Sequence, residues 1–150
     1  MTRQLALVVN PTSGNGRGSR MLDRVRDRLR RDGAAVDVVA GRDGDEAFDR
    51  LRDRVAAGVD GVVAVGGDGL VNIALQVVGG TDIPLGVVPA GTGNDIARSL
   101  GIVPGDLAAA VDLVRLGHTR RLDLGRANGR WFAGVLGEIR ALATIAAPNV

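Results

Sequence analysis

One stretch, from Gly61 to Asp95, constrains the fold of this 150-residue chain more than any other. It contains two short apolar runs, Val62–Val65 and Leu85–Val88, and each run leads into a glycine-rich turn that carries an aspartate. Between the two turns, apolar residues recur at helical spacing. A strand, a glycine turn and a helix, followed by a second strand and turn, are typical of a parallel α/β sheet. We therefore predict an α/β fold with three layers, in which helices cover a Rossmann-like parallel sheet.

The two turns read Gly66-Gly67-Asp68-Gly69 and Gly91-Thr92-Gly93-Asn94-Asp95. Because parallel sheets bind ligands beyond the carboxyl ends of their strands, we expect both turns to lie side by side at that edge. Glycines let the backbone approach a ligand, and free N–H groups before a helix form a nest for phosphate oxygens. A carboxylate in such a nest makes sense if it holds Mg²⁺, orients water or accepts a proton. The alternative is that Asp68 and Asp95 only cap the helices that follow them.

Composition excludes several classes of phosphate-binding protein. All 19 basic residues are arginine, and the chain has no cysteine. A Walker P-loop and a protein kinase both need a phosphate-pairing lysine. A dinucleotide fingerprint after the first strand fails because Ser19 stands where its third glycine would be. The missing cysteines exclude disulfides and thiolate metal sites.

The net charge is only +2, so the high pI of 10.7 does not indicate a nucleic-acid partner, and we expect none.

The remainder of the chain continues the alternation of strands and helices. We expect strands at Leu5–Val9 and Ala35–Val39, and a helix at Leu107–Leu116 that ends before Gly117. The predicted buried stripes of the helices are Met21, Leu22, Val25 and Leu29; Ala47, Leu51 and Val55; Val71, Ala74, Leu75 and Val78; and Leu107, Val111 and Val114. No apolar run approaches the ~20 residues that a membrane span needs, and we see no signal peptide. We therefore expect a cytoplasmic protein that is at most peripheral at a membrane.

A row of arginines follows one face of the first predicted helix. Its members are Arg17, Arg20, Arg24, Arg28 and Arg31. The row is either a solvated face, in which Asp27 and Arg31 form an ion pair, or a surface attracted to an anionic membrane or a phosphate.

The pattern changes from His118 onward. Arg120–Gly125 and Trp131–Val135, joined by Ala127-Asn128-Gly129, read as a β-hairpin. We therefore divide the chain into an α/β nucleotide-binding domain at residues 1–117, crossover strands into an incomplete β-sandwich domain at 118–137, and an atypical tail at 138–150. The sequence offers His118 no partner ligands for a metal site, and we take it as structural or solvent-exposed.

Three motifs occur in order along the chain. They are Asn10-Pro11-x-Ser13-Gly14-x-Gly16, Gly66-Gly67-Asp68-Gly69 and Pro89-x-Gly91-Thr92-Gly93-Asn94-Asp95-x-Ala97-Arg98. In this order and spacing they resemble the catalytic domain of the diacylglycerol kinase and sphingosine kinase superfamily. Arg121–Gly125 and Trp131-Phe132 look like that family's crossover into its second domain, so the resemblance covers about residues 4 to 137.

The resemblance implies a phosphofructokinase-like α/β domain joined to a β-sandwich, with ATP and Mg²⁺ bound between them. Its implied activity is transfer of the γ-phosphate to a hydroxyl of a lipid, of the diacylglycerol or sphingoid-base class, at the membrane surface. The implied nucleotide contacts are Asn10, Pro11, Ser13, Gly14, Gly16, Gly66, Gly67, Gly69, Gly91, Thr92, Gly93 and Asn94. The implied catalytic residues are Asp68 and Asp95, which would organise Mg²⁺ directly or through water. For Gly93 we expect a positive φ or a contact with phosphate.

The chain departs from the family pattern in three places. Leu70 replaces the commoner Thr, as in the sphingosine kinase branch, and Ile73 stands where many members carry Glu. Gly137–Arg140 departs where the family continues with a glycine-rich turn, which indicates a truncated or frameshifted chain. Two alternatives to a lipid kinase are an NAD kinase-like enzyme and a non-catalytic nucleotide-binding remnant.

The last prediction from the sequence concerns the chain by itself. Two strands alone are marginal in water, and Trp131, Phe132, Val135 and Leu136 would form an uncovered apolar edge. We expect the chain to bind ATP weakly, to self-associate through residues 118–137, and not to phosphorylate lipid.

Overall fold

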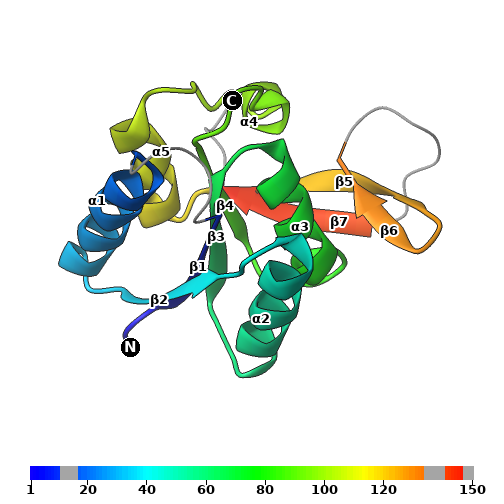
Figure 1. Cartoon of the computed structure of the whole chain (residues 1–150), viewed down its shortest axis with the longest axis horizontal. Helices are drawn as coiled ribbons and strands as arrows, with labels where there is room; N and C mark the ends of the chain where they lie inside the picture. The colour runs from blue at the N-terminus through cyan, green and yellow to red at the C-terminus, as the bar shows by residue number, and fades with distance from the viewer. Residues whose placement is uncertain (11–16, 134–140, 147–150) are drawn as a thin grey trace.

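A computed structural model describes residues 1–10, 17–133 and 141–146 (Figure 1). The strands are β1 Gln4–Val9, β2 Ala35–Ala40, β3 Gly61–Gly66, β4 Leu85–Pro89, β5 Thr119–Ala127, β6 Arg130–Phe132 and β7 Ala141–Ala146. They form one sheet in the order β2-β1-β3-β4-β7-β5-β6. The first four strands in this order are parallel, and β5 pairs antiparallel with both β6 and β7. The predicted α/β fold with a parallel sheet is therefore confirmed.

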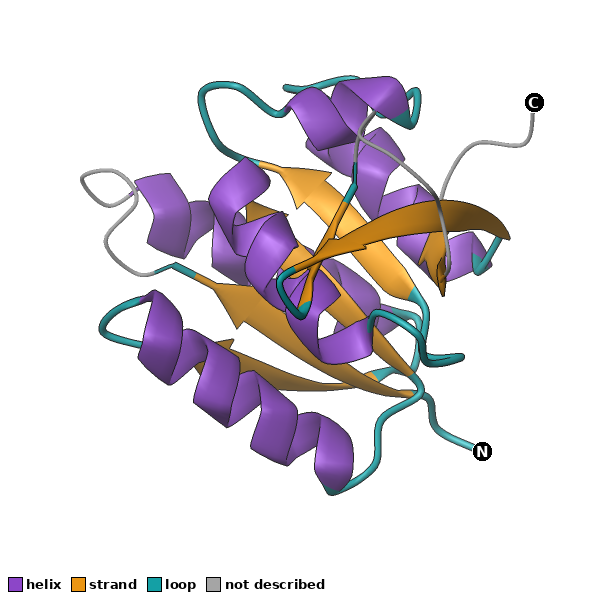
Figure 2. Cartoon of the chain, turned by 90° about the vertical axis from the view of Figure 1, so that its right-hand side faces the viewer, coloured by secondary structure: helices purple, strands orange, loops and turns teal. Residues whose placement is uncertain are grey.

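The helices cover both faces of the parallel strands. They are α1 Arg17–Arg31, α2 Gly44–Ala56, α3 Asp68–Val78, α4 Asp95–Ser99 and α5 Leu107–Leu116. Helices α2 and α3 pack side by side on one face, and α1 and α5 pack on the other (Figures 1 and 2). The three layers predicted from the sequence are present.

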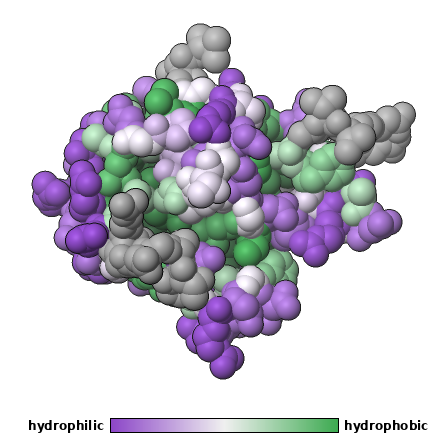
Figure 3. Space-filling model, turned by 45° about the horizontal axis from the view of Figure 1, so that its top comes forward, coloured by the Kyte–Doolittle hydropathy of each residue, from purple (hydrophilic) through white to green (hydrophobic). Residues whose placement is uncertain are grey.

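Aliphatic side chains fill the space between the layers. All six residues of β3 are buried, and α3 buries the predicted stripe of Val71, Ala74, Leu75 and Val78 together with Leu70. Of the other predicted stripes, Met21, Leu22, Val55 and Leu107 are only partly buried. Hydrophilic side chains gather toward the rim of the face in Figure 3, with apolar residues nearer its middle. None of the described helices is long and apolar enough to cross a lipid bilayer.

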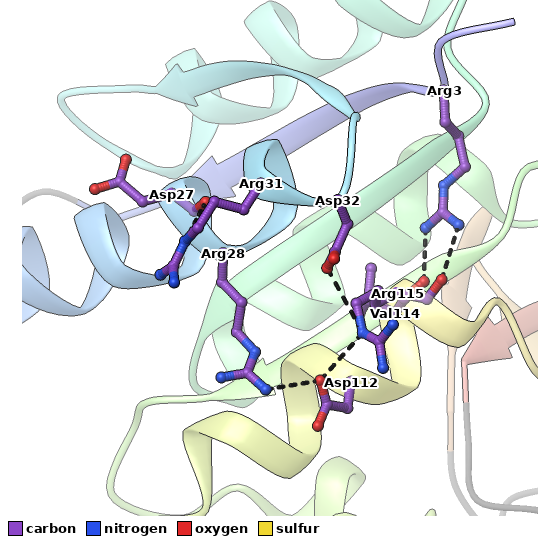
Figure 4. A network of polar contacts seen from close by, with 8 residues as sticks. All are labelled: Arg3, Asp27, Arg28, Arg31, Asp32, Asp112, Val114 and Arg115. Carbon is purple, nitrogen blue, oxygen red and sulfur yellow. Dashed lines mark hydrogen bonds and ion pairs between the residues drawn. The ribbon is translucent and has the colours of Figure 1, made fainter.

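A polar network joins α1 to α5 (Figure 4). Arg28 donates to Asp112 at 2.9 Å, and Arg115 lies 3.5 Å from Asp32 and 3.3 Å from Asp112. The hydrogen bond from Arg28 is the main cause that lowers the pKa of Asp112. One member of the predicted arginine row thus has a structural role. The predicted Asp27–Arg31 ion pair is wrong, because Arg31 donates to the carbonyl oxygen of Asp27.

The predicted β-hairpin is confirmed, since β5 and β6 pair antiparallel, but this part of the sheet differs from the prediction in three details. The β5–β6 hairpin has a two-residue turn, Asn128–Gly129, with φ of 49° and 77°, as a type I′ turn requires. We did not predict β7, which lies in the expected tail and pairs with six residues of β5. The expectation that Trp131 and Phe132 are uncovered is wrong, since both are half-buried. Val135 and Leu136 lie outside the described residues.

Gly79 and Gly125 provide the room for these two aromatic rings. A Cβ on Gly79 would come within 2.6 Å of Trp131 Cδ1, and a Cβ on Gly125 within 2.1 Å of Phe132 Cζ. The hairpin therefore packs closely on the end of α3 instead of presenting a free apolar edge.

Candidate functional site

The two glycine turns lie against each other at the carboxyl edge of the sheet. Strands β3 and β4 are neighbours, and the backbone N–H of Ala90 donates to Gly66 at 2.9 Å, just beyond the strand ends. A Cβ on Gly91 would lie 2.4 Å from the Cα of Gly67, so a side chain there would push the two turns apart. The expected juxtaposition of the turns is confirmed, and glycine at position 91 is what permits it.

Asp68 connects the two turns through its carboxylate. Its Oδ2 accepts a hydrogen bond from the N–H of Asp95 at 3.0 Å, and its Oδ1 accepts one from the N–H of Ile96 at 2.9 Å. These N–H groups open α4 and have no acceptor within that helix. The N-cap of α3 is Gly67, with no side-chain bond. Asp68 thus does not cap its own helix, as the alternative interpretation required, but the helix of the neighbouring turn.

Asn94 shapes the second turn from inside. It adopts a left-handed conformation with φ 57° and ψ 38°, and its side chain is buried. Its Oδ1 accepts from the N–H of Gly91 at 2.9 Å, and its Nδ2 donates to the Gly91 carbonyl at 2.8 Å. The positive φ that we expected at Gly93 is therefore wrong, because Asn94 carries it instead. Asparagine tolerates this conformation because its short polar side chain can bond locally.

Asp95 lies in a different environment from Asp68. Its side chain is 87% exposed, and its nearest cation is Arg98 at 3.7 Å. Arg98 also donates to the carbonyl of Gly93. The site therefore holds one carboxylate whose orientation backbone N–H groups fix and one that solvent reaches freely.

The described residues contain no group of three or more acidic or histidine side chains that could surround a metal ion. Mg²⁺ commonly binds proteins through one or two carboxylates, keeping waters and substrate phosphates as its other ligands. Asp68 and Asp95 fit that mode, because Asp95 is exposed and each Asp68 oxygen accepts one of the two backbone hydrogen bonds and keeps a second lone pair for a ligand.

The remaining predicted residues fall into four groups. Gly66 is buried, and a Cβ there would meet the side chain of Leu70 at 2.7 Å. Gly69, Thr92 and Gly93 are exposed, and a Cβ on Gly69 would have nothing within 4 Å. Asn10 follows β1 at the same edge of the sheet. Pro11, Ser13, Gly14 and Gly16 lie outside the described residues.

A cavity of about 220 Å³ opens beside Asn10 and Gly69. Its lining is Val9, Asn10, Gly41, Asp43, Gly44, Ala47, Gly69, Leu70 and Ile73. It lies beyond the carboxyl ends of β1 and β2, where ligands bind in open parallel sheets. Both departures from the family pattern inside α3, Leu70 and Ile73, give this cavity apolar walls.

The loop from β2 to α2, which sequence reasoning did not include in the site, forms the far side of this cavity. A Cβ on Gly41 would lie 2.3 Å from the backbone nitrogen of Ala47. Asp43 caps α2 by accepting from the N–H of Glu46 at 2.9 Å. Glu46 in turn accepts from the backbone N–H of Arg42 at 2.6 Å, and that bond, with the Arg42 side chain, lowers the pKa of Glu46 to about 2. The glycine–aspartate pattern of Gly41-x-Asp43-Gly44 was the available signal.

Comparison with known proteins gives a consistent picture. A family model for the diacylglycerol kinase catalytic domain matches residues 4–127. A curated diacylglycerol kinase of Mycobacterium tuberculosis H37Rv is 43% identical over 137 residues, covering 88% of this chain and 44% of the relative. The Bacillus subtilis strain 168 diacylglycerol kinase is 31% identical over 137 residues, covering 90% of this chain and 45% of the relative.

Solved structures agree with the sequence relatives. The crystal structure of a putative diacylglycerol kinase from Bacillus anthracis Sterne matches with a TM-score of 0.73 at 28% identity, over 87% of this chain and 47% of that one. The chain thus spans about half the length of the curated relatives it matches.

Proposed function

This chain belongs to the diacylglycerol kinase catalytic-domain family, and from that membership we propose that it forms the nucleotide-binding part of a lipid kinase. The reaction is transfer of the γ-phosphoryl group of ATP to a lipid hydroxyl, with Mg²⁺ as the metal. The acceptor belongs to the diacylglycerol or sphingoid-base class, presented at a membrane surface.

The observation that carries this proposal is the position of Asp68 between two glycine turns. Its carboxylate accepts hydrogen bonds from Asp95 N and Ile96 N, so it links the first turn directly to the start of α4. Phosphoryl transfer needs mainly positioning and charge neutralisation, because the protein does little covalent chemistry. Two glycine turns that the Asp68 carboxylate links would hold a nucleotide in a fixed position, which is the contribution that phosphoryl transfer needs from the protein.

The residues have separate tasks under this proposal. Gly67 and Gly91 bring the backbones together and leave room for phosphate oxygens above them. Asp68 holds the first turn of α4, and Asp95 faces solvent, where metal-bound water and phosphates would lie. Mg²⁺, held by Asp95 and Asp68 directly or through water, would supply the charge that neutralises the phosphate oxygens.

The cavity beside Asn10 and Gly69 gives a place for the remainder of the nucleotide. Leu70, Ile73 and Ala47 supply apolar walls, and Asn10 and Asp43 supply polar groups. Mostly apolar walls with a few polar groups are typical of small-molecule sites.

The test is label transfer from γ-labelled ATP with the intact gene product. Diacylglycerol and a sphingoid base in mixed micelles are the acceptors, and NAD is the competing acceptor of the NAD kinase-like alternative. We expect Mg²⁺-dependent labelling of one lipid, and none of NAD. Labelling of NAD alone, or ATP binding without transfer to any acceptor, would overturn the proposal.

A further inference from the structure

A second, larger groove lies on the outer side of α2 and α3, beneath the β5–β6 hairpin. Its volume is about 610 Å³, within the range of small-molecule sites. Gly44 and Ile73 line both this groove and the smaller cavity at the sheet edge. An occupant of the groove would therefore lie next to the proposed nucleotide.

Side-chain contacts hold the hairpin wall of the groove in place. Gln76 donates through Nε2 to the carbonyl of Trp131 at 2.6 Å and accepts through Oε1 from its N–H at 2.9 Å. The indole ring packs against Gly79. On the hairpin, the guanidinium of Arg126 lies 4.7 Å from the centre of the Trp131 ring. The groove is thus built before any ligand arrives.

The groove carries two arginines that no described carboxylate neutralises. Arg126 and Arg130 line it and are exposed, whereas other arginines of the chain pair with carboxylates, as Arg54 does with Asp37 at 2.7 Å. Asp45, on the opposite wall, lies in the first turn of α2. Phe48 and Ile73 add apolar surface to the lining of the groove.

We propose that this groove binds a phosphate monoester attached to an apolar chain, the chemical class of the product that a lipid kinase makes. The proposal rests on the proposed function for the identity of the ligand, but the binding chemistry is independent of it. Guanidinium groups bind phosphate oxygens through paired N–H groups, and stacking on Trp131 holds the Arg126 plane in one orientation. Phe48 and Ile73 accommodate the first carbons of the chain.

Trp131 makes the proposal directly testable, because it is the only tryptophan of the 150-residue chain. Its fluorescence reports events at the Arg126 wall, and calorimetry gives the affinity independently. The probes are dihexanoyl phosphatidate as a monomer, dihexanoyl phosphatidylcholine, inorganic phosphate, and ATP. We expect phosphatidate to change the fluorescence saturably and to bind more tightly than phosphate alone, and phosphatidylcholine to have no effect.

Variants assign the binding to the groove. Arg126→Gln and Arg130→Gln should each weaken phosphatidate binding roughly tenfold or more, since each removes charge-assisted hydrogen bonds. Asp45→Asn should strengthen it, because a repelling charge is lost. Arg121→Gln is the matched control: it removes a charge from the same strand, where Arg121 pairs with Asp82, and should change nothing.

Three results would overturn the proposal. Equal binding of phosphatidylcholine would show a merely apolar groove, and equal loss of affinity in Arg121→Gln would show non-specific attraction to a basic protein. Competition between ATP and phosphatidate for the Trp131 signal would make the groove part of the nucleotide site. Failure of the proposed function is distinct, since it would abolish label transfer and leave phosphatidate binding to Trp131 intact.

Discussion

Asp68 and Asp95 occupy similar turns, yet the residues around them differ. The Asp68 carboxylate accepts two backbone hydrogen bonds from the start of α4, and Asp95 is almost fully exposed. Substituting them therefore separates a structural contribution from a chemical one. Gly91 and Gly69 offer a similar contrast. Gly91 lies against the backbone of Gly67 in the neighbouring turn, whereas a Cβ on Gly69 would contact nothing within 4 Å.

Asp68→Asn should destabilise the fold by about 1–2 kcal/mol, because it weakens two hydrogen bonds to a charged acceptor. It should also lower kcat of the intact gene product about a hundredfold, more than it weakens ATP binding. Asp95→Asn should change stability by no more than about 0.5 kcal/mol, as expected for an exposed side chain, and should still lower kcat. Denaturant unfolding and label transfer measure the two effects. If kcat is unchanged in Asp68→Asn, the only role of Asp68 is to cap α4.

Gly91→Ala should cost about 1–3 kcal/mol, since the new Cβ would lie 2.4 Å from a backbone atom of Gly67 that cannot move alone. Gly69→Ala is its control. The added methyl meets nothing within 4 Å, and alanine favours a helix over glycine by about 0.5–1 kcal/mol. Thermal unfolding compares them. Equal destabilisation by both changes would contradict the close approach of the turns. Weaker ATP binding in a stable Gly69→Ala protein would assign Gly69 to the nucleotide contact.

At the scale of elements, local patterns predict those features that local interactions determine. The bounds of α5 follow from Leu107 and Gly117, and the stripe of α3 follows from its spacing. The bond from Asp68 to Asp95 could not be read in this way, because the two residues come together only when β3 and β4 pair. The strand β7 was not predicted for the same reason, since it depends on its pairing with β5. The positive φ at Asn94 is instead a local feature, because the side chain bonds to Gly91 three residues earlier, and the glycine at position 93 was the more obvious candidate for it.

The start of α2 predicts a specific dependence of stability on pH. Backbone and side-chain bonds from Arg42 lower the pKa of Glu46 from 4.5 to about 2 in the folded chain. Glu46 therefore contributes stability that is present above about pH 4.5 and is lost as the pH falls through about 2. Glu46→Gln removes this contribution, so the wild type should be the more stable above pH 5, and the difference should shrink toward pH 2. Urea unfolding of both proteins across this range checks it. A difference that does not vary with pH would assign the effect to packing.

The edge strand β2 presents carbonyl groups that two arginines cover. Arg30 of α1 donates to the Val36 carbonyl at 2.9 Å, and Arg50 of α2 donates to the Ala40 carbonyl at 2.9 Å. Val38 lies between them and is 40% exposed. Uncovered edge strands pair with other chains, so these donors protect the edge.

Removing both donors in Arg30→Ala/Arg50→Ala should therefore cause concentration-dependent association, seen by light scattering. The control Arg24→Ala/Arg52→Ala removes the same charge from the same two helices, and its association should not differ from that of the wild type. Adding Val38→Lys to the first variant should reverse the association. Association of both double variants to the same extent would show that lost net charge is the cause.

At the scale of the whole molecule, the sheet has two edges, and side chains cover both. At the β2 edge, Arg30 and Arg50 donate to outward-facing carbonyl groups. At the β6 edge, Gln76 forms hydrogen bonds with the backbone N–H and the carbonyl of Trp131. Self-association through residues 118–137 stays a prediction, but an uncovered apolar hairpin no longer supports it. The strength of self-association should instead depend on whether Gln76 keeps its hydrogen bonds to the backbone of β6.

We therefore expect weak association of the wild-type chain and clearly stronger association of Gln76→Leu, which keeps the side-chain volume and loses both hydrogen bonds. The same change should destabilise the fold by about 1–3 kcal/mol, since the backbone groups of Trp131 lose their partners. Sedimentation over a concentration series measures the association. Asn72→Leu, one turn earlier on α3, is the comparison: it removes a side-chain acceptor of Gln76 Nε2, 3.3 Å away, and leaves both bonds between Gln76 and Trp131 in place. Addition of Arg130→Pro should abolish the new association if strands pair along β6, because proline disrupts an edge. If association instead persists in that variant, the contact lies outside β6, and the hairpin is not the interface.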